Sequence, residues 1–213
     1  MGRATHEEPW HRQAVGGLWE QIGRLQLDFL RAQGLQPHHS LLDIGCGSLR
    51  AGVHLIAYLE RGRYVGVDRD QALLDAGRDE ELGTEMFERK QPTLLCDAEF
   101  DFERLGRLFD VALAQSLFTH LPANAIVRCL AETERALVAG GELYATFFEA
   151  PNRRWLEPIE QCADVVTYLD RDPYHYDPGF FVWACEGTAL SVSPPFDWGH
   201  PRNQRMLIFS KSA

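Results

Sequence analysis

The sequence predicts an α/β fold in which short buried strands alternate with helices. The first observation behind this prediction is the stretch Leu41–Gly52, where an apolar run leads into two glycines and then into apolar residues at helical spacing. The second is Tyr64–Asp68, another short apolar run, which ends in a carboxylate. The third is size, because 213 residues with 45% hydrophobic content can bury a large core without disulfides or metals. We therefore expect a single domain over residues 1–213.

The stretch around Gly45 and Gly47 predicts a ligand site at the carboxyl end of the first strand. Two glycines one residue apart let the chain turn sharply and let a ligand lie against bare backbone, and the amides of the next helix point at the turn. A dinucleotide fingerprint needs a small third residue where this chain has Arg50, and the next glycine is Gly52. Asp43 precedes the turn inside the strand. A carboxylate there suits a cationic ligand better than a pyrophosphate.

Two further carboxylates follow buried strands. Asp68 lies about 20 residues after the glycines, where a carboxylate can accept hydrogen bonds from ribose hydroxyls. Asp97 and Ala98 follow a third strand, Thr93–Cys96, and a carboxylate and an amide at that place can recognise an adenine edge. The pieces DIGCG, GVD, CDA, FDVALAQSLFTHL and GGELYATFF occur in this order. Over residues 41–149 they resemble the class I S-adenosylmethionine-dependent methyltransferase family.

This resemblance implies a three-layer αβα sandwich of the Rossmann-like methyltransferase type, with a seven-stranded, mostly parallel sheet and an antiparallel last strand. It also implies an enzyme that transfers a methyl group from S-adenosylmethionine. Arg50 is expected to reach a carboxylate of the cofactor or of a substrate, with a surface arginine as the alternative, and Gln115 is expected to face the cofactor crevice. The residues that the resemblance assigns to the cofactor are Asp43, Gly45 and Gly47 for the methionine moiety, Asp68 for the ribose, and Asp97 and Ala98 for the adenine.

The chain before the first strand is expected to have two parts. Residues 1–13 are polar without periodicity and predict a loose arm, with His6 and His11 solvated rather than bound to a metal. Residues 14–34 predict a covering helix, since apolar side chains repeat at helical intervals up to a terminal glycine cap. Two interpretations stay open: this helix packs only on the sheet, or it also helps to close the ligand cleft. The insertion at 149–179 is the other candidate for a lid.

The middle of the chain predicts helix, strand and helix around one histidine. Residues 70–91 predict a helix and then a charged connection, and Phe109–Ser116 predicts the fourth strand. His120 follows this strand, Pro122 then opens a helix, and Gly140–Gly141 ends it. By topology His120 lies beside the crevice, where it can act as a general base on a hydroxyl or amine. The alternative is a packing histidine that holds the loop.

Acceptor recognition is expected from two segments after the fifth strand. The insertion 149–179 is rich in aromatic and polar residues, and loops carry specificity on a rigid scaffold. The loop 196–204 joins the last two expected strands, Ala189–Val192 and Met206–Ser210, and is expected at the same rim. A self-stabilised loop with an Asp197–Arg202 pair is the alternative. The candidate acceptor-binding residues are Glu149, Tyr174, His175, Trp198, His200 and Arg202.

Composition narrows the class of acceptor. The formal net charge is -10 and basic residues form no run, which disfavours nucleic acid as a partner. Residues 115–118 read Gln-Ser-Leu-Phe instead of the Asn/Asp-Pro-Pro-aromatic motif of base-flipping and amide N-methyltransferases. We therefore expect a small-molecule acceptor with an oxygen or nitrogen nucleophile. The alternatives are a non-catalytic S-adenosylmethionine-binding module and a protein or RNA methyltransferase.

The remaining composition bears on compartment and metal content. Five scattered cysteines are expected to be reduced thiols in a cytoplasmic protein. The sequence shows neither a signal peptide nor a membrane-length apolar run, so no membrane partner is expected. It also shows no ligand cluster for a metal. The oligomeric state is not predicted.

Overall fold

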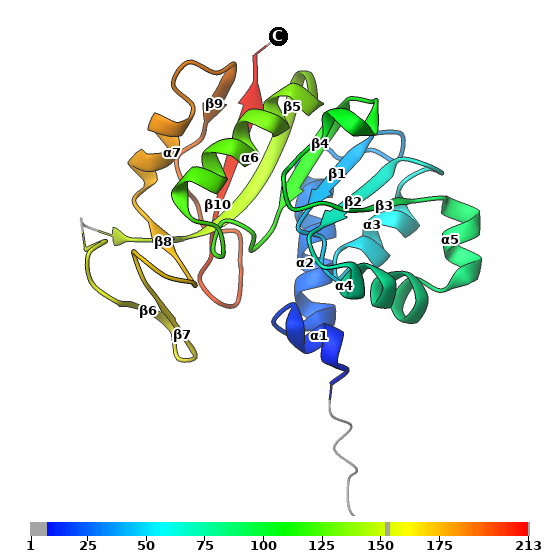
Figure 1. Cartoon of the computed structure of the whole chain (residues 1–213), viewed down its shortest axis with the longest axis horizontal. Helices are drawn as coiled ribbons and strands as arrows, with labels where there is room; N and C mark the ends of the chain where they lie inside the picture. Colours follow the sequence, from blue (N-terminus) through cyan, green and yellow to red (C-terminus); the bar gives the residue numbers. More distant parts are fainter. Residues whose placement is uncertain (1–7, 152–153, 213) are drawn as a thin grey trace, which may run out of the picture.

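The computed structural model of the chain describes residues 8–151 and 154–212, and one large sheet runs through it (Figure 1). Its main path has the order β3-β2-β1-β4-β5-β10-β9, and β8 adds to it by pairing with the end of β5. Neighbours among β1 to β5 pair in parallel, while β10 is antiparallel to both β5 and β9. The predicted parallel sheet with an antiparallel last strand is confirmed. The strands of this path are β1 (Leu41–Ile44), β2 (Tyr64–Asp68), β3 (Thr93–Cys96), β4 (Phe109–Ala114), β5 (Leu137–Glu149), β9 (Leu190–Val192) and β10 (Arg205–Lys211).

Helices cover both faces of this sheet, which confirms the three-layer arrangement. On one face Leu30, Leu55 and Leu74, from three different helices, pack into a core with strand residues. On the other face Leu130 and Phe181 join a second core. Figure 1 shows α6 lying along one face and α2 and α3 behind the other. The helices in these layers are α2 (Trp19–Ala32), α3 (Gly52–Tyr58), α4 (Gln71–Ala76), α6 (Ala123–Ala136) and α7 (Pro178–Ala184).

β1 lies at the centre of the sheet, and this position determines where a ligand can bind. Its residues are all buried, as its apolar run predicts. Leu41 pairs with Tyr64 of β2 on one side and with Val111 of β4 on the other. The chain order of the strands therefore reverses at β1. In open α/β sheets ligands bind in the crevice outside the carboxyl ends of the strands at such a reversal.

The prediction of a loose arm over residues 1–13 is wrong for the part that the structure describes. Residues Trp10–Ala14 form the helix α1, and His11 is buried rather than solvated. The covering helix begins at Trp19, later than predicted, because Gly16, Gly17 and Leu18 all have positive φ. Contacts with residues about 70 positions away hold α1, and such contacts leave no periodic signal in the sequence. His6 lies outside the described residues.

Three other segments are more ordered than the sequence indicates. The connection after α4 continues as a π-helical segment η1 (Gly77–Leu82) and a helix α5 (Thr84–Lys90). A short 3-10 turn η2 (Glu103–Leu105) precedes β4. The insertion carries a hairpin of β6 (Ile159–Cys162) and β7 (Val165–Thr167), followed by β8 (His175–Tyr176).

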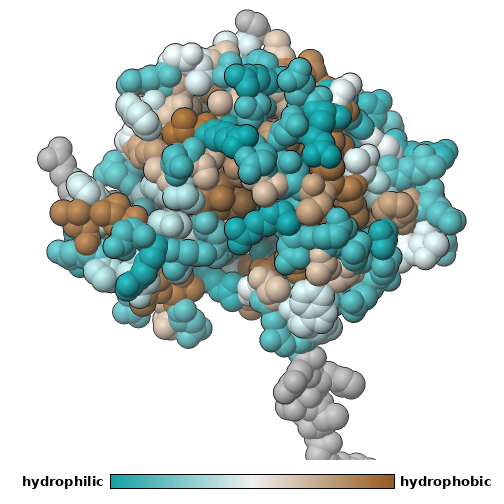
Figure 2. Space-filling model, viewed as in Figure 1, coloured by the Kyte–Doolittle hydropathy of each residue, from teal (hydrophilic) through white to brown (hydrophobic). Residues whose placement is uncertain are grey.

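Figure 2 shows hydrophobic side chains on one face of the molecule at scattered places among hydrophilic ones. Among the residues that the structure describes, no helix combines the length and the apolar character needed to span a bilayer.

Candidate active site

A cavity of about 680 Å³ lies at the carboxyl ends of β1, β2 and β4, where the strand order reverses. The glycine turn forms its floor. The loop after α1, including Val15 and Gly16, forms one wall. Val165 and Asp172 of the insertion bound the opposite wall. Volumes of about 300–1,000 Å³ are typical of small-molecule sites. The cavity thus joins the predicted donor side to the predicted acceptor side.

The glycine turn has the backbone geometry that its sequence predicts. Gly45 and Gly47 have φ of +74° and +55°, a region that side chains rarely adopt. The Gly45 amide donates to the Val67 carbonyl at 2.7 Å. Val15 packs directly on the turn, since a Cβ on Gly47 would lie 2.5 Å from its Cγ1. Glycine at position 47 therefore permits both the turn and the close approach of the N-terminal segment.

Asp43 lines the cavity and is buried. Its Oδ2 accepts a hydrogen bond from the Tyr64 hydroxyl at 2.7 Å. Burial raises the pKa of Asp43 to about 7, and Asp68 adds to this effect, while Tyr64 and Arg50 oppose it. A positive charge in the cavity would favour the ionised form of this carboxylate. Direct contact between Asp43 and a cofactor stays a prediction.

The two other predicted carboxylates lie together along one side of the cavity. Asp68 accepts hydrogen bonds from the Gly47 amide at 2.8 Å and from the Asp70 amide at 2.9 Å. The Asp97 amide donates to the Asp68 carbonyl at 2.9 Å, and Asp97 and Ala98 both line the cavity. The adjacent strands β2 and β3 place them side by side. Carboxylate oxygens here can accept hydrogen bonds from hydroxyl or amino groups of a nucleoside.

Two guanidinium groups line the cavity beneath the loop that follows α1. Arg50 donates to the carbonyls of Val15 at 2.7 Å and Gly17 at 2.9 Å, and Arg202 donates to the Gly16 carbonyl at 2.7 Å. Burial, and then the charge of Arg202, lower the pKa of Arg50 to about 10. Among the described residues neither arginine forms an ion pair with a carboxylate. Two cations with only neutral partners suit a carboxylate ligand.

This arrangement excludes two of the alternatives considered above. Arg50 is buried, so it is not a surface arginine. Arg202 contacts Gly16 and not Asp197, whose carboxylate accepts from the Gly199 amide at 2.9 Å. The proposed pair within the 196–204 loop is therefore not formed.

A buried polar network extends from the end of β4 to the final loop. Gln115 accepts a hydrogen bond from Arg50 at 2.8 Å, and its amide nitrogen lies 3.3 Å from His200 Nε2. Gln204 accepts from Ser116 at 3.0 Å and also lines the cavity. Burial, followed by the charges of Arg50 and Arg202, lowers the pKa of His200 to about 4. His200 is therefore a neutral imidazole at physiological pH.

His120 lies at the acceptor side of the cavity and has a carboxylate partner. Its Nδ1 is 2.6 Å from Oδ1 of Asp172, which comes from the insertion. Both residues line the cavity, and both side chains are 55% exposed. An imidazole whose Nδ1 faces a carboxylate leaves Nε2 free to accept a proton. The sequence does not predict a role for Asp172, because nothing near residue 172 indicates a partner 52 positions away.

Most of the other predicted acceptor-binding residues do not line the cavity. His175 is buried between the Thr167 hydroxyl at 2.9 Å and the Trp155 carbonyl at 2.8 Å. Trp198 is buried and donates to the Gln204 carbonyl at 3.0 Å. The remaining positions are Tyr174, whose amide donates to the Thr119 carbonyl, Glu149, whose carboxylate lies 3.4 Å from Arg205, and His200, which lies behind Gln115. Of the six candidates, only Arg202 lines the cavity.

Comparison with known proteins agrees with the fold. Residues 42–143 match a family model described as a methyltransferase domain. The ubiquinone biosynthesis O-methyltransferase of Hahella chejuensis is 25% identical over 171 residues, which cover 78% of this chain and 67% of that protein. The structure resembles magnesium protoporphyrin IX methyltransferase from Synechocystis PCC 6803 with bound S-adenosylmethionine (TM-score 0.64, 14% identity, 97% of this chain and 86% of that chain). It also resembles the CcbJ methyltransferase from Streptomyces caelestis (TM-score 0.68, 16% identity, 97% of this chain and 100% of that chain).

The chain has the fold of class I methyltransferases, and its cavity lies where such a sheet binds ligands. Residues 42–143 match a methyltransferase domain, the chain is an S-adenosylmethionine-dependent methyltransferase, and S-adenosylmethionine is its cofactor. The groups along the cavity fit that molecule. Among the described residues Arg50 and Arg202 have no carboxylate partner and could hold its carboxylate, and Asp68 and Asp97 could accept hydrogen bonds from its nucleoside.

Proposed function

We propose that this methyltransferase methylates a small molecule at an oxygen or nitrogen nucleophile, and that His120, oriented by Asp172, accepts the proton which the nucleophile loses. The 2.6 Å contact between His120 and Asp172 at the open side of the cavity carries this proposal. S-Adenosylmethionine supplies an activated methyl group when bound. The protein residues hold the donor and acceptor in line and exclude water, and such proximity lowers a barrier by about 7–11 kcal/mol.

The cofactor is proposed to lie along the side of the cavity that runs from Arg50 to Asp97. Arg50 and Arg202 bind its carboxylate, Asp68 accepts from the ribose, and Asp97 with Ala98 contacts the adenine. Asp43 lies behind the glycine turn, and its carboxylate stabilises the positive charge of the methionine moiety. This placement leaves the opposite side of the cavity for the acceptor.

The acceptor side combines an apolar wall with one proton acceptor. Leu117, Leu121, Phe148 and Val165 line it together with His120. Such a surface suits a largely apolar acceptor, for example an aromatic ring, that carries one hydroxyl or amine near His120. By its name the relative from Hahella chejuensis is an O-methyltransferase of ubiquinone biosynthesis, which supports a small-molecule acceptor with an oxygen nucleophile.

Electrostatics supports a small molecule over a nucleic acid. The chain has a formal net charge of -10, whereas binding to a phosphate backbone needs a basic surface. The hairpin and the segment that carries Asp172 bound the cavity mouth, which further restricts it to a compact acceptor. His120 and Asp172 line the cavity with half-exposed side chains, which disfavours a non-catalytic binding module with a blocked acceptor side.

A panel of small phenols, catechols and aromatic amines tests the proposal. Formation of S-adenosylhomocysteine is measured with wild-type protein, His120→Ala and Asp172→Asn. We expect His120→Ala to lower turnover about 10²–10⁴-fold without weakening the binding of S-adenosylhomocysteine, with part of the activity returning at high pH, where the acceptor ionises unaided. Asp172→Asn should lower turnover less, because the imidazole remains.

His38→Ala is the matched control, since His38 is exposed before the amino end of β1, at the opposite edge of the sheet. It should leave turnover unchanged. Full activity of His120→Ala on the acceptor that the wild-type enzyme methylates would refute the role of His120 as a proton acceptor. A Michaelis constant that rises with an unchanged pH profile would make His120 a binding residue instead.

A further inference from the structure

The helix α1 and the loop that follows it, residues 10–17, cover the donor side of the cavity. Gln13, Val15 and Gly16 contribute directly to its wall. We refer to residues 10–17 as the lid. α1 has only five residues, and a helix of this length is not stable by itself in water. Contacts with the rest of the protein must therefore hold the lid in place.

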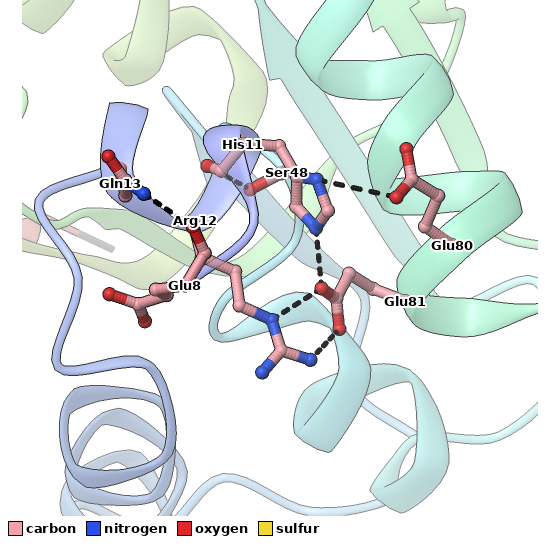
Figure 3. Close-up of polar contacts among 7 residues, drawn as sticks. All are labelled: Glu8, His11, Arg12, Gln13, Ser48, Glu80 and Glu81. Carbon is pink, nitrogen blue, oxygen red and sulfur yellow. Dashed lines mark hydrogen bonds and ion pairs between the residues drawn. The ribbon is translucent and has the colours of Figure 1, made fainter. Parts of the chain in front are cut away.

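The outer side of the lid is attached to η1 by a cluster of charged groups (Figure 3). His11 Nε2 lies 2.6 Å from Glu81 Oε1. Arg12 donates to both oxygens of the same carboxylate, at 2.6 Å and 2.7 Å. The Ser48 hydroxyl donates to the His11 carbonyl at 3.0 Å. We refer to the contacts of Glu81 with His11 and Arg12 as the latch.

Two of the three latch side chains are sheltered from solvent. The side chains of His11 and Glu81 are 1% and 7% exposed. Trp19 packs against it, with the Arg12 guanidinium 4.7 Å from the centre of its ring. Burial raises the pKa of Glu81, but the hydrogen bonds from Arg12 and His11 outweigh this and lower it, so Glu81 is ionised at neutral pH. Charge-assisted, bidentate contacts of this kind are among the stronger polar interactions.

The inner side of the lid is held by different residues. Arg50 and Arg202 donate to the carbonyls of Val15, Gly16 and Gly17, and both arginines line the cavity. None of the latch residues lines the cavity. The latch can therefore be weakened by mutation without changing a group that touches the cofactor.

We propose that the latch keeps the lid closed over the bound cofactor, so that opening of the lid governs how fast the cofactor binds and how fast the demethylated product leaves. A closed lid packs Val15 against the glycine turn and restricts the donor side of the cavity. Loop opening of this kind sets the rate of product release in many enzymes. The proposal rests on the cofactor assignment and is independent of the acceptor and of His120.

Glu81→Gln tests the proposal, because glutamine keeps the shape of the side chain and removes its charge. The association and dissociation rates of S-adenosylhomocysteine are measured by surface plasmon resonance on the full chain. We expect dissociation to become about tenfold faster or more, as for the loss of a charge-assisted hydrogen-bonded pair, and association to become faster as well. Amide hydrogen exchange in residues 10–17 should also accelerate.

Glu80→Gln is the matched control, since Glu80 is the neighbouring carboxylate and lies 3.6 Å from His11 with a side chain that is 55% exposed. It should change the rates less than twofold. Arg12→Gln removes the latch residue that belongs to the lid, and the Arg12 side chain is 34% exposed. This variant should reproduce the effect of Glu81→Gln. The double variant should show no further acceleration, because both changes remove one interaction.

If the association and dissociation rates of S-adenosylhomocysteine in Glu81→Gln and Arg12→Gln match those in Glu80→Gln, the proposed role of the latch is refuted. The cofactor would then enter and leave through the acceptor opening. A lower melting temperature with unchanged rates would give the cluster a structural role only. Absence of S-adenosylhomocysteine binding in wild-type protein would be a different failure, that of the cofactor site itself.

Discussion

Replacement of Asp43 by Asn should change the pH dependence of stability. In the folded protein the pKa of Asp43 is raised from 3.8 to about 7, chiefly by burial. The folded state therefore holds a proton on Asp43 between about pH 4 and pH 7 that the unfolded state releases, so this residue lowers the free energy of unfolding as pH rises through that window. Three pH units at about 1.4 kcal/mol each amount to about 4 kcal/mol.

An asparagine side chain at this position would keep a carbonyl oxygen for the Tyr64 hydroxyl, which donates to Asp43 at 2.7 Å, but would have no proton to lose. The free energy of unfolding is measured by urea denaturation from pH 4 to pH 7.5 without cofactor. The Asp43→Asn variant should gain stability relative to wild type as pH rises, by up to about 4 kcal/mol across the window.

Asp28→Asn provides the control, because Asp28 is exposed on α2 and the substitution changes the net charge equally. Its difference from wild type should be nearly constant with pH. Parallel pH curves for wild type and Asp43→Asn would refute the reasoning, because they would mean that Asp43 is ionised in the folded cofactor-free protein.

Three further predictions follow from the site. Asp68→Ala should weaken S-adenosylhomocysteine binding by about 1.5–3 kcal/mol in calorimetry, the value of hydrogen bonds to a charged group, and unchanged affinity would contradict the ribose assignment. His200→Ala should raise the Michaelis constant and leave the pH profile of turnover in place, since the pKa of His200 is about 4; a lost pH limb would show that it transfers protons. Duplex DNA and structured RNA should not be retained in a gel-shift assay at physiological salt, and salt-sensitive submicromolar binding would favour an RNA acceptor.

The geometry of the glycine turn and of the strand ends was predictable because its signals are local. Asp43, Gly45 and Gly47 belong to one strand and the turn after it, and a buried strand followed by closely spaced glycines has few structural solutions. Asp68 and Asp97 each end a strand, and parallel pairing of β2 with β3 brings them to the same edge. The order of the strands and the fold class were both predicted from the resemblance to the methyltransferase family.

The acceptor side and the lid depend on contacts between distant residues. The sequence shows a polar stretch around His11, but burial of this residue depends on Glu81, 70 positions later. Asp172 reaches His120 only through the path of the insertion, which has no regular period. The sequence around His175 predicts a side chain that is free to bind the acceptor. In the structure His175 is buried inside the insertion, where the Thr167 hydroxyl and a backbone carbonyl are the hydrogen-bond partners of its two ring nitrogens.

Transfer of a labelled methyl group tests the central claim most directly. Purified enzyme and S-adenosylmethionine labelled with tritium in the methyl group are incubated with a cell extract, which is then separated by size into metabolites, RNA and protein. If the enzyme methylates a small molecule, the label should appear in the metabolite fraction. The label in that fraction should fall strongly with His120→Ala and stay unchanged with His38→Ala. Label that appears in RNA or protein, and not among the metabolites, would contradict it.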